Sequence, residues 1–97
     1  MKGYLIGQID MHSPEAYEAY RSQSGGIVAQ YGGRFLARGG KVESVEGNAP
    51  RARVVVLEFP TFEAAKTFYE SPEYQAIVPF RQRASDGDFF LVEGFDG

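Results

Sequence analysis

The sequence predicts a single α+β domain whose elements follow one another as strand, helix, strand, strand, helix, strand. Two segments that open with serine–proline or with threonine carry apolar residues at helical spacing. Between and around them, runs of valine, leucine, isoleucine and phenylalanine are typical of strands. The 97 residues suffice for one hydrophobic core, and no low-complexity stretch divides them. We therefore treat residues 1–97 as one domain.

The first half of the chain predicts a strand followed by a helix. The strand is expected over Tyr4–Ile9. The helix should begin at Pro14, because Ser13 can cap it and Glu15 places an acid in its first turn. Its buried stripe is expected to contain Ala16, Tyr20, Ile27 and Tyr31, flanked by Tyr17 and Val28.

Glycines divide the next part of the chain. Gly25-Gly26 lies inside the predicted helix, which could bend or break there, since each interior glycine costs about 1 kcal/mol relative to alanine. The helix should end at Gly32-Gly33, and Arg34–Arg38 should form the second strand. The segment Gly39–Arg51 combines glycines, charges and two valines, so we expect an exposed excursion that could include an edge strand and could act as a lid or a dimer arm.

The second half repeats the pattern. Arg53–Phe59 is the most hydrophobic segment and predicts the third strand. Thr61 should cap a short helix. The apolar face of this helix is expected to contain Phe62, Ala65, Phe68 and Tyr69. Ser71 and Pro72 predict a further helical turn that runs to about Val78, before Pro79, and Phe89–Phe95 predicts the fourth strand.

This order is that of a ferredoxin-like domain, with a four-stranded antiparallel sheet and both helices on one side. The strands themselves are apolar on both faces. In Val54–Phe59 and in Phe89–Val92, successive residues that point to opposite faces are almost all hydrophobic. One face would remain uncovered, and a second copy of the chain could bury it. We therefore expect a homodimer in which two sheets pair as a dimeric α/β barrel.

Composition restricts the partners and the compartment. The formal net charge of −3 argues against binding to nucleic acid, which requires clustered Lys and Arg. The chain contains no cysteine and one histidine, His12, so we expect neither a metal site nor a cofactor. No apolar run is long enough for a signal segment or a membrane span, so a cytoplasmic protein with no membrane contact is expected.

Several segments carry a resemblance to a known family. They are Tyr31-Gly32-Gly33-Arg34-Phe35-Leu36-Ala37-Arg38-Gly39-Gly40, Glu46-Gly47, Glu58-Phe59-Pro60, Ala64-Ala65-Lys66-Thr67-Phe68-Tyr69, Ser71-Pro72-Glu73-Tyr74, Arg81 and Val92-Glu93-Gly94. Over nearly its whole length the chain resembles the domain-of-unknown-function family numbered 1330. The resemblance implies a dimeric α/β barrel, in a superfamily that includes cofactor-independent monooxygenases, muconolactone isomerases and haem-handling proteins. It implies no particular reaction, because one fold hosts many functions.

Arg34 and Arg38 are the first candidates for a ligand site. Four residues apart on a regular strand, they would point to the same face. They could form structural ion pairs with Glu58 and Glu93, or one of them could hold an anionic substrate in a mostly apolar pocket. Arg81 and Arg83 could add to such a site.

Glu58 and Glu46 are the candidates for general acid or base. Burial near aromatic residues would raise the pKa of such a carboxyl group towards neutrality. Either glutamate could equally be a turn or ion-pair residue. His12, placed just before a helix, could be a neutral base or an ordinary surface histidine, and we leave it out of the catalytic set.

Aromatic residues could form the walls of the pocket. Tyr69 and Tyr74 lie on either side of Ser71-Pro72, so their hydroxyl groups could meet at a site beside the helix end, or the rings could simply pack. Phe59 is a further candidate wall residue. The sequence thus predicts a small-molecule-binding homodimer. It would be a metal-independent enzyme of isomerase or monooxygenase type, acting on a small anionic or aromatic metabolite, or alternatively a non-catalytic binding or structural dimer.

Overall fold

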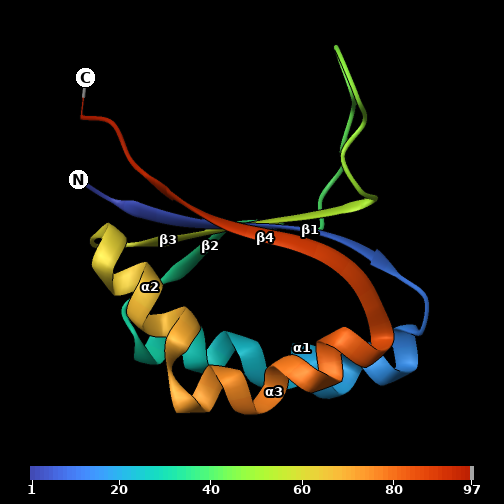
Figure 1. The fold of residues 1–97 in the computed structure, drawn as a ribbon, viewed down its shortest axis with the longest axis horizontal. Helices are drawn as coiled ribbons and strands as arrows, with labels where there is room; N and C mark the ends of the chain where they lie inside the picture. The colour runs from blue at the N-terminus through green and yellow to red at the C-terminus, as the bar shows by residue number, and fades with distance from the viewer. Residues whose placement is uncertain (97) are drawn as a thin grey trace.

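The structure is a computed structural model that describes residues 1–96. Seven elements follow one another along the chain (Figure 1). They are β1 (Gly3–Met11), α1 (Pro14–Gln30), β2 (Arg34–Arg38), β3 (Arg53–Phe59), α2 (Phe62–Glu70), α3 (Pro72–Ala84) and β4 (Ser85–Glu93). Among residues 1–96, no helix combines the length and the apolar character needed to cross a membrane.

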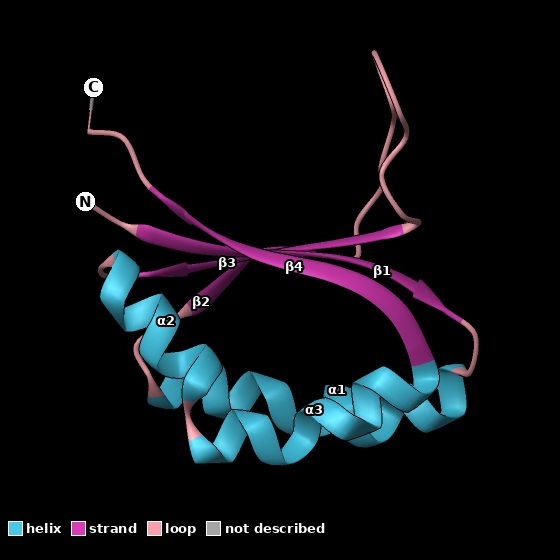
Figure 2. Ribbon diagram, in the orientation of Figure 1, coloured by secondary structure: helices cyan, strands magenta, loops and turns pink. Residues whose placement is uncertain are grey.

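The four strands form one sheet in the order β2-β3-β1-β4, with every neighbouring pair antiparallel. All three helices lie on one side of this sheet, as Figure 2 shows. The predicted ferredoxin-like layout is therefore confirmed. We call the sheet face that carries the helices the inner face and the opposite one the outer face.

Helix α1 is continuous, although the sequence suggested a break at Gly25-Gly26. Ser13 caps it through a 3.4 Å bond from the Ala16 amide, and Gly32, with φ of 79°, follows its end. The buried stripe differs from the predicted one. It consists of Tyr17, Tyr20, Ser24 and Val28. The prediction chose apolar residues at helical spacing and so included Ala16, which is exposed, and passed over a buried serine.

The C-terminal helix is longer than predicted. Ser71 caps α3 by accepting a 3.2 Å bond from the Tyr74 amide, as expected, but the helix runs through Pro79 to Ala84 instead of ending near Val78. Burial explains the difference. The residues of α3 on both sides of the proline are buried, and packing outweighs the lost hydrogen bond. Those residues are Tyr74, Ile77, Val78, Arg81 and Ala84.

The longer helix also moves the last strand. Strand β4 begins at Ser85, directly after α3, and ends at Glu93, whereas Phe89–Phe95 was predicted. The side chain of Ser85 donates a 2.7 Å hydrogen bond to the Arg81 carbonyl, which ties the strand start to the helix end. Register pairs Phe89 with Gly7 and Phe90 with Ile6, so Phe89 belongs to the inner face and Phe90 to the outer.

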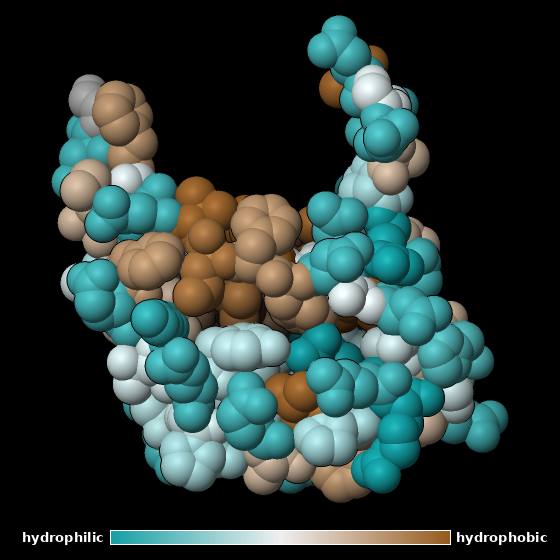
Figure 3. All heavy atoms as spheres, viewed as in Figure 1, coloured by the Kyte–Doolittle hydropathy of each residue, from teal (hydrophilic) through white to brown (hydrophobic). Residues whose placement is uncertain are grey.

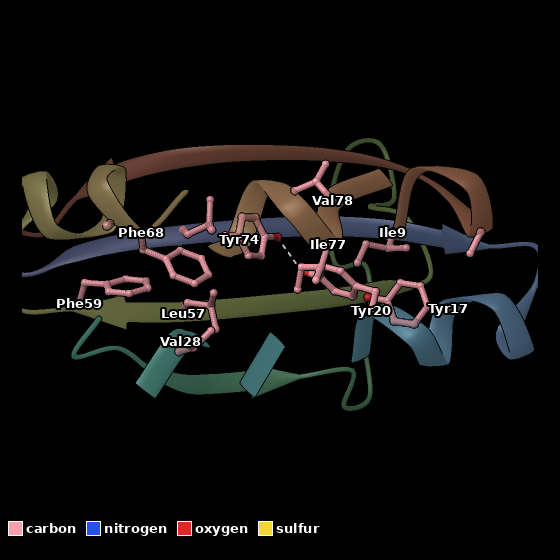
Figure 4. Close-up of a cluster of buried hydrophobic side chains, with 13 residues drawn as sticks. Ile9, Tyr17, Tyr20, Val28, Leu57, Phe59, Phe68, Tyr74, Ile77 and Val78 are labelled. Carbon is pink, nitrogen blue, oxygen red and sulfur yellow. Dashed lines mark hydrogen bonds between the residues drawn. The ribbon is translucent and has the colours of Figure 1, made fainter. Parts of the chain in front are cut away.

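The hydrophobic core fills the space between the inner face and the helices. Phe59, Phe68 and Tyr74 are almost fully buried, and their rings contact one another (Figure 4). Ring centroids lie 5.0 Å apart for Phe59 and Phe68 and 4.5 Å apart for Phe68 and Tyr74. Such packed aromatic pairs bury large apolar areas and define the distance between sheet and helices.

The outer face has no cover within the described chain. It presents an apolar surface that Figure 3 shows between two projecting segments. Its central residues are Ile6, Val54, Val56, Phe90 and Val92. Phe90 is 46% and Val92 39% exposed, and Leu36 beside them is 49% exposed.

The two projections are residues 94–96, which follow β4, and the segment 39–52, which we call the arm (Figure 1). The arm contains no strand, so the edge strand that the sequence allowed is absent from it. Ion pairs hold its end against the outer face. The Arg51 guanidinium donates to Asp10 at 2.8 Å and to Asp88 at 2.9 Å, and the Ala52 amide donates to Asp10 at 3.1 Å.

Candidate functional site

A cavity lies between the inner face and α1. Most of the residues that line it are aromatic or aliphatic. Each strand and α1 contribute: Gly7 of β1, Phe35 of β2, Val55 of β3, Phe89 of β4 and Tyr17 of α1. Its empty volume is about 430 Å³ when the solvent-filled mouth is included. The space open to the centre of a water molecule is only about 20 Å³. With the side chains as they stand, that is room for about one ordered water.

Gly7 accommodates one of the aromatic walls of this space. A methyl group on Gly7 would overlap the ring of Phe89, which lies across β1 at that point. On α1, Gly25 lies beside the Arg38 guanidinium, with a nearest approach of 3.7 Å for an added methyl group. This is an ordinary van der Waals distance, so an alanine at this position would also leave room for the arginine.

A bulge in β2 separates the two candidate arginines. Pairing with β3 shifts register between Phe35 and Ala37, so Arg34 pairs with Glu58 on the outer face while Arg38 pairs with Val55 on the inner face. The prediction that both point to one face is therefore wrong, because an extra residue in a strand reverses the alternation beyond it. Only Arg38 belongs to the cavity.

Arg38 is held weakly at the mouth of the cavity. Its guanidinium carbon lies 4.0 Å from the centroid of the Phe35 ring, and Nη2 donates a 3.5 Å hydrogen bond to the Arg21 carbonyl. No carboxylate pairs with it among residues 1–96. An exposed guanidinium with these contacts can change position at little cost.

Arg53 is a second arginine in the cavity, and it was not among the predicted site residues. It pairs with the buried Ile9 on the inner face and lies 5.9 Å from the Tyr17 ring centroid. Its Nε is buried without a hydrogen-bond partner in the described chain. Gly39, with φ of 73°, passes so close to this guanidinium that a methyl group there would overlap it. The position of Arg53 on the inner face could have been predicted from the alternation of side chains along β3, which places it on the same face as Val55, Leu57 and Phe59.

The charged residues that line the cavity are all arginines. Arg21 is paired with Glu18 at 2.9 Å, whereas Arg38 and Arg53 have no ion pair within residues 1–96. An acidic protein thus carries two unpaired guanidinium groups around one apolar space. Because the buried Nε of Arg53 lacks an acceptor and both guanidinium groups lack a carboxylate partner, the cavity favours an anion.

Two tyrosines meet at the buried end. The hydroxyl oxygens of Tyr20 and Tyr74 lie 2.6 Å apart, as the dashed line in Figure 4 marks, and both residues line the cavity. Burial raises the pKa of Tyr20 well above its usual range and raises that of Tyr74 as well, while the nearby charge of Arg81 opposes both shifts.

Arg81 lies behind this wall. It is 5% exposed, and its guanidinium carbon stacks 3.8 Å from the centroid of the Phe89 ring and 5.7 Å from that of Tyr20. Its Nε is buried and has no partner among the described residues. Arg81 therefore adds positive charge to the Tyr20 end of the cavity without lining it.

Glu58 lies on the outer face of the sheet. It accepts a 2.9 Å hydrogen bond from Arg34 and a 3.2 Å bond from the Tyr4 hydroxyl. The Arg34 guanidinium holds the pKa of the Glu58 carboxyl below its usual range. The expectation of a raised pKa is wrong, because the arginine on the neighbouring strand outweighs the effect of partial burial.

The other candidates lie away from the cavity. Glu46 is exposed in the arm, and His12 is exposed before α1, with its amide bonded to the Ala84 carbonyl at 3.0 Å. Phe59 is a core residue that does not line the cavity. Tyr69 borders a separate apolar hollow at the β4 edge. Arg83 is exposed on α3.

Of the predicted binding residues, Arg38 and Tyr74 thus share the cavity, and Arg81 supports its wall. The other lining residues were not predicted as part of a site, and they include Tyr20, Phe35, Arg53 and Phe89. Within residues 1–96, no three His, Cys, Asp or Glu side chains are grouped so that they could hold a metal ion.

Comparison with solved structures supports the fold. A protein of unknown function from Rhodopseudomonas palustris, RPA0582, is 21% identical, with 99% of this chain and 84% of that one covered and a TM-score of 0.73. SnoaB, a cofactor-independent oxygenase from Streptomyces nogalater, is 11% identical, with 99% and 95% covered and a TM-score of 0.69. A dimeric ferredoxin-like protein from Thermobifida fusca is 12% identical, with 97% and 92% covered and a TM-score of 0.57.

At these identities the likeness concerns the fold. No curated protein matches the chain. The family comparison gives a more specific result, since the model of the domain of unknown function DUF1330 matches residues 2–95. That match covers nearly the whole chain and agrees with the resemblance seen in its sequence. The chain belongs to the DUF1330 family.

Proposed function

We propose that this protein is a homodimer that binds a small anionic, aromatic or otherwise flat metabolite in the cavity between the sheet and α1. One observation carries the proposal: the cavity contains Arg38 and Arg53, and neither has a carboxylate partner among residues 1–96. Nε of Arg53 is buried without a hydrogen-bond partner, which is costly, and a bound anion would remove that cost and pair with the exposed Arg38 as well. The aromatic walls suit a flat apolar body attached to the anionic group.

Entry of such a ligand requires Arg38 to move. The present side-chain positions leave room for about one water. Arg38 is exposed and held by one 3.5 Å hydrogen bond and by its contact with Phe35. A ligand carboxylate or phenolate would replace both contacts with a stronger, charge-assisted one. The arginine would then close over the ligand it recognises.

The second copy is proposed to cover the outer face. That face is apolar around Ile6, Val56 and Phe90 and lies between the arm and the C-terminal residues (Figure 3). Pairing two such faces would bury them from water, as a stable interface of about 800 Å² per partner requires. The ferredoxin-like protein from Thermobifida fusca, which has a similar fold, is dimeric.

If the protein catalyses a reaction, a metal-independent reaction of monooxygenase type fits the cavity better than an isomerase that relies on a side-chain base. Among residues 1–96, no carboxylate or histidine lines the cavity. SnoaB, a cofactor-independent oxygenase, has a similar fold. The alternative is a binding protein without catalysis, in which the same arginines would hold the anion. Turnover of a bound ligand would distinguish the two.

A thermal-shift panel of small aromatic carboxylates, phenols, lactones and haem tests the binding proposal. A ligand at 100 times its dissociation constant adds about 2.7 kcal/mol of stability, which raises the unfolding temperature by several degrees. We expect such a shift with anionic aromatic compounds. It should disappear in Arg38→Ala and persist in the control Arg83→Ala, because Arg83 is exposed on α3 outside the cavity.

Two results would contradict the proposal. One is the absence of any shift across the panel at millimolar concentration. The other is a shift that Arg38→Ala and Arg83→Ala leave equally intact, since the ligand would then bind elsewhere.

A further inference from the structure

The buried polar groups around the cavity that lack a partner are all hydrogen-bond donors. Within residues 1–96, Nε of Arg53 and Nε of Arg81 are buried without an acceptor. The Tyr20–Tyr74 pair supplies a third donor: two hydroxyl groups share one bond, so one hydroxyl hydrogen has no acceptor in the described chain. A buried donor without an acceptor costs free energy. The site therefore favours a ligand that brings acceptor atoms to it.

The tyrosine pair recognises a single oxygen atom. Tyr20 is 8% and Tyr74 1% exposed, so their hydroxyl groups lie at the buried end of the cavity. The surroundings there are aromatic, with Phe89 and Tyr17 nearby. A carboxylate has two oxygens and about four lone-pair sites to satisfy. One hydroxyl donor suits instead the lone oxygen of a flat ring or enol.

Within the described chain, the cavity contains no group that removes a proton at neutral pH. The titratable and charged groups that act on the tyrosine pair are Tyr17 from α1, Tyr69 from α2 and Arg81 from α3. The other charged residues that line the cavity are Arg21, Arg38 and Arg53. Burial raises the pKa of both Tyr20 and Tyr74, so both hydroxyl groups stay protonated. They can donate a hydrogen bond but cannot act as a base.

We propose that the ligand is an acidic phenol or enol that binds as its anion, an inference that rests on the proposed function. The ionised oxygen accepts the spare hydrogen bond of the Tyr20–Tyr74 pair, and the guanidinium groups of Arg38, Arg53 and Arg81 balance its charge. The ligand's proton passes to the solvent on binding. The protein selects compounds that are acidic in themselves.

4-Nitrophenol tests this directly, because its anion absorbs visible light and the neutral phenol does not. Titrated across its own pKa with excess wild-type protein, the bound compound should ionise at least about one pH unit lower than in water, which corresponds to about 1.4 kcal/mol. The variant Tyr20→Phe/Tyr74→Phe should bring the pKa of the bound compound back towards its value in water.

The double variant is expected to fold, since replacing both partners of a buried bond by apolar groups of the same shape is nearly neutral. The control is Tyr31→Phe, which removes a hydroxyl that donates to Glu73 at 2.7 Å outside the cavity. It should leave the pKa of bound nitrophenol lowered. If the double variant unfolds, the wild-type titration still tests whether the compound binds as its anion.

Each other outcome has a distinct meaning. Nitrophenol that binds in its neutral form, with its pKa unchanged or raised, overturns the inference and leaves the proposed function standing. The same holds if benzoate binds and nitrophenol does not. If neither compound nor any member of the thermal-shift panel binds, the proposed function fails and the inference fails with it.

Discussion

A single extra residue in β2 decides which arginine reaches the cavity. The bulge between Phe35 and Ala37 sends Arg34 to Glu58 on the outer face and Arg38 to the inner face. The sequence showed both arginines but not the bulge, because no glycine or proline marks it. Arg53, in contrast, could be assigned from the alternation of its own strand. At the residue scale, regular stretches were predictable and the irregular one was not.

Gly7 carries a prediction at the same scale. In Gly7→Ala the new methyl group overlaps the Phe89 ring and forces it into the cavity. Overpacking of this kind costs about 1–3 kcal/mol of stability. We expect a corresponding fall in the urea midpoint, together with loss of ligand-induced thermal shifts.

The matched control is Gly26→Ala. A methyl group at Gly26 meets nothing within 4 Å, and the residue lies inside α1. This variant should gain about 1 kcal/mol of stability and keep ligand binding. A Gly7→Ala protein as stable as wild type and with intact binding would show that Gly7 is not needed to form the cavity.

Among the elements, the first three strands and the position of α1 were predictable because their apolar residues recur with the period of the structure they form. The start of β4 and the end of α3 were not. Pro79 indicates an end, and only the packing of Ile77, Arg81 and Ala84 under the sheet carries the helix past it. Since that packing depends on residues distant in sequence, local patterns do not contain it.

The arm gives a prediction at the scale of an element. Its anchor, Asp10, accepts hydrogen bonds from the Ala52 amide and the Arg51 guanidinium, and these lower the pKa of Asp10 below its usual range. A carboxyl group whose pKa is lower in the folded than in the unfolded chain stabilises the fold above its unfolded pKa. That contribution is lost as the pH falls through the folded value.

Asp10→Asn should therefore be less stable than wild type near neutral pH, and the difference should shrink as the pH is lowered from about 7 towards about 2, as urea unfolding can measure. Glu43→Gln, a change in the exposed arm, should match wild type throughout. A stability difference between wild type and Asp10→Asn that is the same at both pH values would rule out the charge of Asp10 as its source.

The order and arrangement of the elements could be predicted best from the sequence, and the residues of the site could be predicted least. Strand and helix order follows from periodicity along the chain, and it fixes the ferredoxin-like sheet with its helices on one side. The cavity arises where all four strands, α1 and α3 converge, so its members are scattered in sequence. Tyr20 and Tyr74 meet 54 residues apart, and nothing near either residue in the sequence indicates the other.

The apolar outer face predicts a dimer at this scale. Light scattering at micromolar concentration should give twice the chain mass of 10.7 kDa. Val56→Glu, which puts a charge between Ile6 and Ala37 on that face, should give a monomer. The control Ala19→Glu adds the same charge to the exposed side of α1 and should stay dimeric. A monomeric wild type, or a dimeric Val56→Glu, would contradict the interface.

The central claim, that an anion binds between Arg38 and Arg53, is tested most directly by NMR of the arginine Nε–H groups. Benzoate and 4-nitrophenol would be titrated into protein labelled with nitrogen-15. We predict that the Nε–H signals of Arg38 and Arg53 move and saturate with either compound, while those of Arg34 and Arg83, which lie outside the cavity, stay in place. Movement at Arg34 or Arg83 instead, or no movement at any arginine at millimolar concentration, would contradict the account.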